Sequence, residues 1–236
     1  SFGLPSGHAQ NAAVVWGTIG AYFRKGWLWV LLIGLIFLVG LSRLYLAVHF
    51  PHDVLVGWIL GIIVLWLFLR LSSPVTAWIK RQSLPTQIGA IFAFSILLIL
   101  LGFLSRLASS GFALPPEWVD NAASSFPEED LINPLDISGI VSNAGAFFGL
   151  AAGACWLRIH GGFDVSGSAA QRFGRYVLGA LGVFLLWFGL GEVFPRGETF
   201  IPFLLRFFRY GLVGLWVTAF APLLFIKIRL AKSIQK

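Results

Sequence analysis

The chain alternates between long apolar runs and shorter segments that hold most of its charged residues. We interpret seven of the runs as helical membrane crossings: Ala9–Phe23, Gly26–Leu41, Val54–Leu69, Ile88–Leu104, Gly139–Leu157, Tyr176–Phe194 and Phe203–Ile226. About 20 apolar residues in a helix cross a bilayer. The runs lack the alternation of barrel strands, and a lipid-exposed open strand leaves its backbone groups unsatisfied. The sequence therefore predicts an all-α fold, a polytopic transmembrane helical bundle of about seven spans.

The composition agrees with a chain that lies mostly in lipid. Of its 236 residues, 58% are hydrophobic and 11% are charged, whereas a soluble domain carries about 25% charged residues. A soluble single-core protein is therefore excluded. The net charge of +7 gives little support to a nucleic-acid partner, because Lys and Arg collect in the cytoplasmic loops of membrane proteins. With Cys155 as its single cysteine, the chain cannot form an intrachain disulfide.

The distribution of Lys and Arg predicts the orientation of the bundle. Twelve of the 17 basic residues fall in alternate connections, which we assign to the cytoplasm: Arg24, Lys25, Arg70, Lys80, Arg81, Arg158, Arg172, Arg175, Lys227, Arg229, Lys232 and Lys236. The opposite side holds the other five and an acidic, proline-containing loop near 105–138, which we expect to be irregular and exposed. This asymmetry suggests a bacterial inner membrane with the acidic loop on the external, periplasmic face.

Glycines recur every fourth residue in two of the predicted helices. Gly57 and Gly61 form one such series, and Gly145, Gly149 and Gly153 form another. Small residues at this spacing let helices approach closely. We expect these stripes to pack helices within one bundle rather than to form a dimerisation face.

Two polar clusters lie at the ends of apolar helices, where ionisable side chains are costly and need a reason. The first is Pro5-Ser6-Gly7-His8, before the first crossing, and the second is the segment 42–53, between the second and third crossings. The predicted topology places both on the external side, at the ends of helices of one antiparallel bundle. We therefore expect the two clusters to meet in space.

Three residues of these clusters have the chemistry of a phosphate-binding site. Ser6 and Gly7 lie where a helix begins, and the free N–H groups and the dipole of a helix start attract anions. Gly7 also allows the backbone to approach an oxyanion closely. Arg43 offers a planar fork of donors that suits a phosphate.

The remaining polar residues add groups that can react. His49 and Asp53 are four residues apart, so the carboxylate can hold one imidazole nitrogen protonated and leave the other free to attack. His8 can protonate a departing oxygen. Together with the phosphate cradle, these groups are what phosphoester hydrolysis through a phosphohistidine requires.

The sequences Pro-Ser-Gly-His and Ser-Arg-x5-His-x3-Asp resemble the second and third signature motifs of the type 2 phosphatidic acid phosphatase superfamily. The resemblance implies that His49 attacks phosphorus, that Asp53 orients it and that His8 protonates the leaving group. It implies that the phosphate is bound by Ser6, Gly7 and Arg43. It also implies catalysis without a metal or another cofactor.

The family's first motif, Lys-x6-Arg-Pro, is absent, because the chain contains no Arg-Pro dipeptide. We interpret the chain as N-terminally truncated, and we expect its activity to be impaired because part of the phosphate-binding site is absent. On this interpretation residues 1–70 are the C-terminal half of a lipid phosphatase core. Residues 71–236 would be an additional four-span membrane region outside the part that resembles the family.

Each polar residue also has a structural interpretation. Ser6 and Asp53 can be helix N-caps, and Arg43 can extend to the lipid headgroups. His52 forms a possible metal cluster with its neighbours, although a variable position near the substrate entrance is our preferred interpretation. Tyr45 can line that entrance or serve as an interfacial aromatic anchor.

Arg206 and Arg209, near the start of the last crossing, can likewise be flanking anchors or guides for an anionic headgroup.

The sequence therefore predicts a membrane lipid phosphatase or diphosphatase whose partners are the bilayer and a lipid phosphate. Candidate substrates from the resemblance are phosphatidic acid, phosphatidylglycerophosphate and polyprenyl diphosphates such as undecaprenyl diphosphate. The alternative is a non-catalytic membrane carrier or scaffold built on a repurposed phosphatase core.

Overall fold

The computed structural model describes residues 3–113, 115–125, 133 and 135–234, and over this range it is built from helices. The chain forms two compact units, Ser1–Arg81 and Gln82–Lys236. Six of the described helical segments are long and apolar enough to cross a membrane. The predicted all-α transmembrane fold is confirmed.

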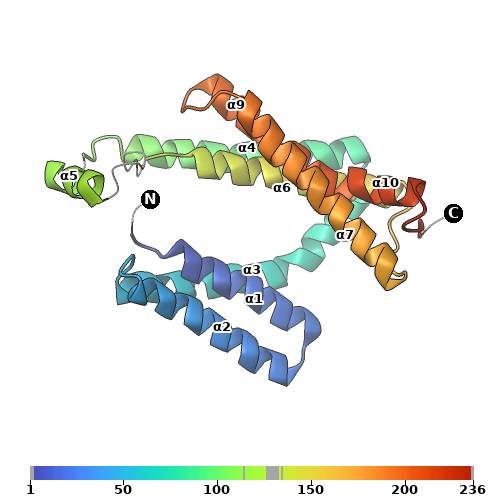
Figure 1. Ribbon diagram of the computed structural model, residues 1–236, viewed down its shortest axis with the longest axis horizontal. Coiled ribbons are helices and arrows are strands. Elements are labelled where there is room, and N and C mark those ends of the chain that lie inside the picture. The colour runs from blue at the N-terminus through green and yellow to red at the C-terminus, as the bar shows by residue number, and fades with distance from the viewer. Residues whose placement is uncertain (1–2, 114, 126–132, 134, 235–236) are drawn as a thin grey trace. The chain divides into compact units, whose positions relative to one another are not determined.

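The first unit consists of three helices, drawn in blue to cyan in Figure 1: α1 (Gly7–Phe23), α2 (Gly26–Tyr45) and α3 (Pro51–Arg81). The connection between α1 and α2 is short, and Arg24 ends α1 in a left-handed conformation with φ of 53°. The 17 residues of α1 extend for about 26 Å at 1.5 Å per residue. This helix is therefore shorter than the others of its unit.

The second unit contains the remaining helices: α4 (Leu84–Ala108), α5 (Pro116–Ser125), α6 (Ser138–Ile159), α7 (Ala169–Phe184), η1 (Leu185–Gly189), α8 (Leu190–Val193), α9 (Phe200–Leu215), η2 (Trp216–Phe220) and α10 (Ala221–Lys227). The segments η1 and η2 are π-helical turns that interrupt two of the membrane helices. Within the unit, α6 lies beside α4 and is crossed by α9 (Figure 1).

The seven predicted crossings fall on helical segments, of which six are long and apolar enough to span a membrane and α1 is not among the six. The expectation of an irregular external loop is wrong in part. Residues Pro116–Ser125 form the helix α5. Proline suits the first position of a helix because its missing N–H has no partner there in any case. The segment 126–132 of the same loop lies outside the described residues.

The glycine stripe of the first unit packs α1 against α3. A Cβ atom on Gly57 would lie 2.6 Å from the carbonyl oxygen of Ser6, and one on Gly61 would lie 2.7 Å from the Cβ of Ala13. Ala9 and Ala13 are buried at this contact. Small residues on both helices therefore bring the two backbones close together.

The stripe of the second unit packs α6 against α9 and η2. Cβ atoms on Gly145 and Gly149 would clash with the carbonyl oxygens of Phe207 and Gly211, and one on Gly153 would clash with the hydroxyl of Thr218. These glycines therefore serve helix packing within one unit, as the spacing predicted.

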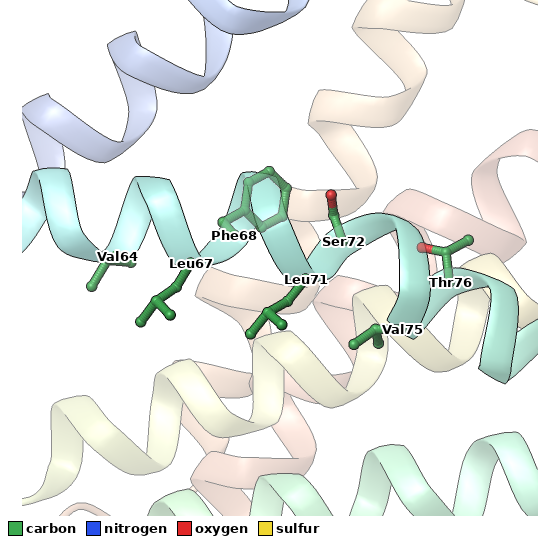
Figure 2. A pocket seen from close by; sticks show the side chains of 7 residues that line it. All are labelled: Val64, Leu67, Phe68, Leu71, Ser72, Val75 and Thr76. Carbon is green, nitrogen blue, oxygen red and sulfur yellow. The ribbon is translucent and has the colours of Figure 1, made fainter.

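The outward surface of α3 is apolar, as expected of a helix that contacts lipid. A shallow pocket on it is lined by one helix alone (Figure 2), through Val64, Leu67, Phe68, Leu71, Ser72, Val75 and Thr76. Five of these seven side chains carry no polar atom. Apolar side chains left exposed in this way are stable where hydrocarbon replaces water around them.

Candidate active site

The start of α1 is set by Ser6, which is completely buried. Its hydroxyl accepts a hydrogen bond from the N–H of Ala9 at 3.5 Å, so Ser6 is the N-cap that the sequence suggested. The next two N–H groups of the chain belong to Gly7 and His8, at the first turn of the helix. These two residues are exposed, so this helix start is accessible to an anion.

Asp53 stabilises the start of α3, but not as the N-cap that the sequence suggested. The helix begins at Pro51, so Asp53 is its third residue and not its N-cap. Its Oδ2 atom accepts a hydrogen bond from the N–H of Phe50 at 2.9 Å. This is the reciprocal half of a capping box, in which an acidic side chain reaches back to the residue before the helix.

A backbone hydrogen bond joins the two polar clusters. The N–H of Ser6 donates to the carbonyl oxygen of Asp53 at 2.9 Å. The missing side chain of Gly57, one turn further along α3, leaves room for the carbonyl of Ser6. The structure therefore places the beginning of α1 directly against the beginning of α3.

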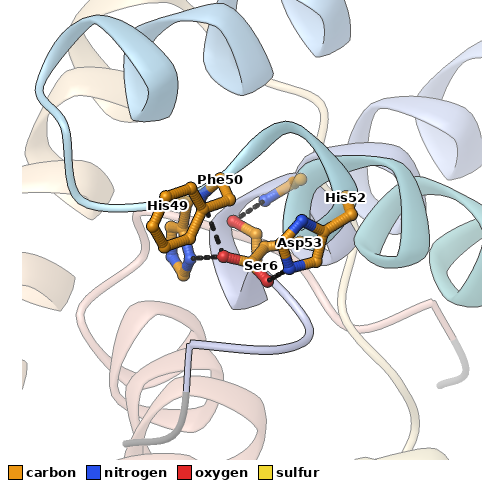
Figure 3. Close-up of polar contacts among 6 residues, drawn as sticks. Ser6, His49, Phe50, His52 and Asp53 are labelled. Atoms are coloured by element: carbon orange, nitrogen blue, oxygen red, sulfur yellow. Dashed lines mark hydrogen bonds and ion pairs between the residues drawn. The ribbon is translucent and has the colours of Figure 1, made fainter.

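The carboxylate of Asp53 lies between two imidazoles (Figure 3). The Nδ1 atom of His49 is 3.5 Å from Oδ2, and the Nε2 atom of His52 is 3.3 Å from Oδ1. Asp53 is 3% exposed, which shields the carboxylate from water. In this arrangement Nδ1 of His49 faces the carboxylate, and Nε2 is the nitrogen left for another partner.

The two histidines differ in their surroundings. The His49 side chain is 15% exposed, and its Nδ1 atom is buried without a hydrogen bond of good geometry to any described residue. The His52 side chain is 68% exposed and stacks on Phe50 with ring centroids 5.6 Å apart. His49 is thus the enclosed member of the pair, and His52 covers the outer side of Asp53.

The other predicted residues lie at the same ends of their helices. Arg43, in the last turn of α2, is half-buried and donates from Nε to the hydroxyl of Ser42 at 3.3 Å. Tyr45 ends α2 and is 88% exposed. A Cβ atom added to Gly7 would meet nothing within 4 Å, so the space in front of this helix start is open.

The possible metal cluster of His49, His52 and Asp53 is not assembled as a three-ligand site. Over the described ranges, no group of three His, Cys, Asp or Glu side chains is arranged to hold a metal ion. The two imidazoles contact different oxygens of one carboxylate instead.

Two residues that shape this geometry were not assigned to the site from the sequence. Phe50 supplies the N–H that fixes the Asp53 side chain, and Gly57 gives the space that α1 needs. The glycine spacing predicted a close helix contact but not the partner, and a backbone donor carries no sequence signal of its own.

Both units match family profiles of the same superfamily. The family profile of the PAP2 superfamily matches residues 1–77, and the profile described as PAP2 superfamily phosphatase, transmembrane extension, matches residues 141–233. The first profile ends close to the predicted end of the phosphatase core near residue 70, and the second shows that similarity to the superfamily extends into the later helices.

Several curated proteins are similar to this chain. Lipid A 4'-phosphatase of Bacteroides thetaiotaomicron is 32% identical over 104 residues, which cover 44% of this chain and 46% of that protein. Phosphatidylglycerophosphatase B of Bacillus subtilis is 42% identical over 77 residues, or 28% and 37% of the two chains. Glucose-6-phosphatase 3 of Rattus norvegicus is 29% identical over 207 residues, or 79% and 56%.

The matched region thus spans between 37% and 56% of the length of these three curated relatives. No solved structure matches this chain.

Proposed function

Because the chain belongs to the PAP2 superfamily, we propose that it carries the reaction centre of a membrane phosphatase and that His49 is its nucleophile. The observation that carries the proposal is the enclosed His49–Asp53 pair, joined through the Asp53 backbone to the start of α1. An orienting carboxylate beside one imidazole nitrogen is the arrangement that activates the other nitrogen.

In the proposed first step, Nε2 of His49 attacks phosphorus while the bond from phosphorus to the leaving oxygen breaks. His8, at the first turn of α1, donates a proton to that oxygen. Asp53 stabilises the positive charge that develops on the His49 ring. The products of the step are a phosphohistidine and the leaving group, which is the free alcohol of a phosphomonoester or the lipid monophosphate of a diphosphate.

In the second step, water attacks phosphorus and the bond between nitrogen and phosphorus breaks. His8 accepts the proton from this water, which returns both histidines to their starting states. Inorganic phosphate is released. Neither step requires a metal ion or an external redox partner.

The phosphate oxygens are held, on this proposal, by the accessible N–H groups at the start of α1 and by Arg43. Gly7 keeps the approach to these N–H groups open, since no side chain stands there. The Nε atom of Arg43 is held by Ser42, so its terminal nitrogens are the ones that face a ligand. Charge-assisted hydrogen bonds of this kind are among the strongest that proteins form.

The substrate we propose is a lipid phosphomonoester or a polyprenyl diphosphate, approached from the external face. Two of the relatives are named for lipid phosphates, and the site lies at the ends of membrane-spanning helices. Tyr45 and His52, both exposed beside the site, would line the entrance. Another relative is named for a sugar phosphate, so glucose 6-phosphate is the appropriate soluble comparison.

The proposal is tested by phosphate release from purified protein, expressed with any residues that precede Ser1. The substrates are short-chain phosphatidic acid, phosphatidylglycerophosphate, undecaprenyl diphosphate and glucose 6-phosphate. His49→Ala is expected to lower turnover by about three orders of magnitude or more. The matched control His160→Ala, which removes an exposed imidazole outside the proposed site, is expected to stay within about threefold of the native chain.

A trapping experiment separates the phosphohistidine from other mechanisms. The native chain, quenched during turnover of a radiolabelled lipid phosphate, should carry an acid-labile label that His49→Ala lacks. Equal turnover in the native and His49→Ala proteins would refute the assignment of the nucleophile. Absence of turnover in both, for every substrate, would favour a carrier or scaffold.

A further inference from the structure

A second cluster of charged side chains lies in the unit Gln82–Lys236. These side chains line a pocket between the segment η1–α8 and the helix α9. A residue of the connection after α8 also contributes to the pocket. Three arginines and one glutamate contribute: Arg196, Arg206, Arg209 and Glu192. Three positive charges against one negative charge leave a net charge of +2, and none of these residues belongs to the proposed reaction centre.

The position of Arg209 along its helix is costly for a charged residue. The segment Phe200–Lys227 is a candidate membrane span of 28 residues, or about 42 Å at 1.5 Å per residue. Arg209 is nine residues after Phe200, about 13.5 Å along the axis, and the hydrocarbon core is about 30 Å thick. An arginine at that depth needs a compensating group, and such residues commonly mark binding sites or pathways.

The described part of the chain compensates Arg209 incompletely. Its guanidinium carbon lies 4.9 Å from the centroid of the Tyr210 ring, and a terminal nitrogen fills the space left free by Gly191. Its Nε atom, however, is buried and donates to no described residue. A buried donor without an acceptor is rare in native proteins and calls for an explanation such as a bound ligand.

The single carboxylate of the pocket does not neutralise the arginines of α9. Glu192 is 3.9 Å from a terminal nitrogen of Arg196, at the limit of an ion pair, and its side chain is 59% exposed. Arg206 and Arg209 appear in no ion pair with any described residue. Within the described ranges, the two arginines of α9 therefore have no carboxylate partner, and Arg209 has only the hydroxyl of Tyr210 as a side-chain acceptor.

The opposite side of the pocket is aromatic. Trp187 and Phe188 line it, and both belong to the π-helical turn η1. Turns of this kind often occur at functional sites because they displace the side chains that follow from regular positions. The Nε1 of Trp187 donates to the hydroxyl of Tyr210 at 3.3 Å, which connects the aromatic side to the arginine-bearing helix.

From this combination we propose that the pocket binds a phosphate group, with Arg206 and Arg209 as its ligands. Two planar guanidinium groups can each form paired hydrogen bonds with phosphate oxygens. Trp187 and Phe188 would contact the apolar part of the molecule that bears the phosphate. The headgroup of an anionic lipid has this chemistry, and so, for the charged part alone, does inorganic phosphate.

The test measures binding rather than turnover, in a background where the proposed catalytic site cannot hold phosphate. The background protein carries Arg43→Gln and His49→Ala. The probe is fluorescent short-chain phosphatidic acid, followed by anisotropy, and fluorescent diacylglycerol with the same chains is the ligand without phosphate. The anisotropy reports binding and does not depend on enzyme activity. A failure of the proposed phosphatase function can therefore be told apart from a failure of this binding site.

Arg206→Gln with Arg209→Gln is expected to weaken phosphatidic acid binding by about tenfold or more, since charge-assisted hydrogen bonds are lost. The matched control is Arg81→Gln with Arg172→Gln, which removes the same charge from exposed positions. It is expected to change binding by less than about twofold. Equal weakening in both double variants, or equal binding of diacylglycerol, would overturn the proposal.

Glu192→Gln gives a result that misfolding cannot imitate. Removing the carboxylate beside the site should tighten phosphatidic acid binding by about two- to fivefold, the range for an exposed charge pair. Unchanged or weaker binding in this variant would count against the proposal. If inorganic phosphate displaces the lipid probe and binds alone with the same dependence on Arg206 and Arg209, the ligand is the free ion; if only the lipid binds, it is the headgroup.

Discussion

Asp53 makes four contacts through three of its atoms. Its Oδ2 accepts the N–H of Phe50 and faces Nδ1 of His49, its Oδ1 lies near Nε2 of His52, and its backbone carbonyl accepts the N–H of Ser6. The Asp53 side chain therefore caps the start of α3 and at the same time fixes the direction of His49. These two effects can be separated by substitution, because the first needs only an acceptor oxygen whereas the second needs a charge.

Asp53→Asn is expected to lower turnover by about 10²- to 10⁴-fold, the usual contribution of a group that supports acid–base chemistry. The amide oxygen can still accept the N–H of Phe50, so the thermal unfolding midpoint should change little. The measurement pairs kcat with thermal unfolding of the same preparation. Asp53→Ala is the comparison, because it should lose stability as well as turnover; a fully active Asp53→Asn protein would contradict the orienting role.

The sequence predicted part of this local arrangement. A spacing of four residues indicated that His49 and Asp53 would face each other, and the start of α1 at Ser6 followed from its capping chemistry. The sequence did not reveal that Asp53 is the third residue of its helix, since Pro51 starts α3 earlier than expected. It also could not show the bond from Ser6 to the Asp53 carbonyl, because backbone groups are the same in every residue.

At the level of elements, the contact between α1 and α3 holds the proposed site together. Gly57 stands opposite the carbonyl of Ser6, and Gly61 stands opposite Ala13. The four-residue period predicted that α3 has a smooth face, but period alone does not select which helix covers it. The π-helical turns were not predicted either, because their apolar side chains continue the pattern of a regular helix.

Gly57→Ala is expected to destabilise the first unit by about 1–3 kcal/mol, the usual effect of overpacking. The added Cβ would lie 2.6 Å from the backbone oxygen of Ser6, which cannot move without displacing the start of α1. Turnover should therefore fall together with stability. Both are measured on the same protein, by thermal unfolding and by phosphate release.

Gly34→Ala is the matched control for this substitution. Gly34 lies in α2, and a Cβ there would meet nothing within 4 Å. The same chemical change should then raise helix stability slightly, by about 0.5–1 kcal/mol. If the two variants behave alike, close packing of α1 on α3 is not what positions the site.

At the level of the whole molecule, the order of the helices relates the two proposed phosphate sites without reference to how the units are placed. Four crossings, through α3, α4, α6 and the segment α7–α8, separate His49 from the connection before α9. An even number of crossings returns the chain to the same side of the membrane. We therefore predict that both proposed sites face the same compartment, and the distribution of Lys and Arg predicts that it is the external one.

Single cysteines test this orientation. In a Cys155→Ala background, we introduce Ser110→Cys and Thr199→Cys on the side of the proposed sites, and Lys25→Cys and Arg172→Cys on the other side; all four positions are exposed. A membrane-impermeant maleimide applied to right-side-out vesicles should label the first two. The second two should be labelled only after permeabilisation.

This pattern would mean that the proposed reaction centre meets lipids of the outer leaflet, and that phosphate is released outside the cell. The reverse pattern would place both sites in the cytoplasm and would show that the basic residues do not determine the orientation. A mixed pattern, with Ser110→Cys and Thr199→Cys labelled from different sides, would contradict the helix count itself. The two proposed sites could then not act on molecules from the same leaflet.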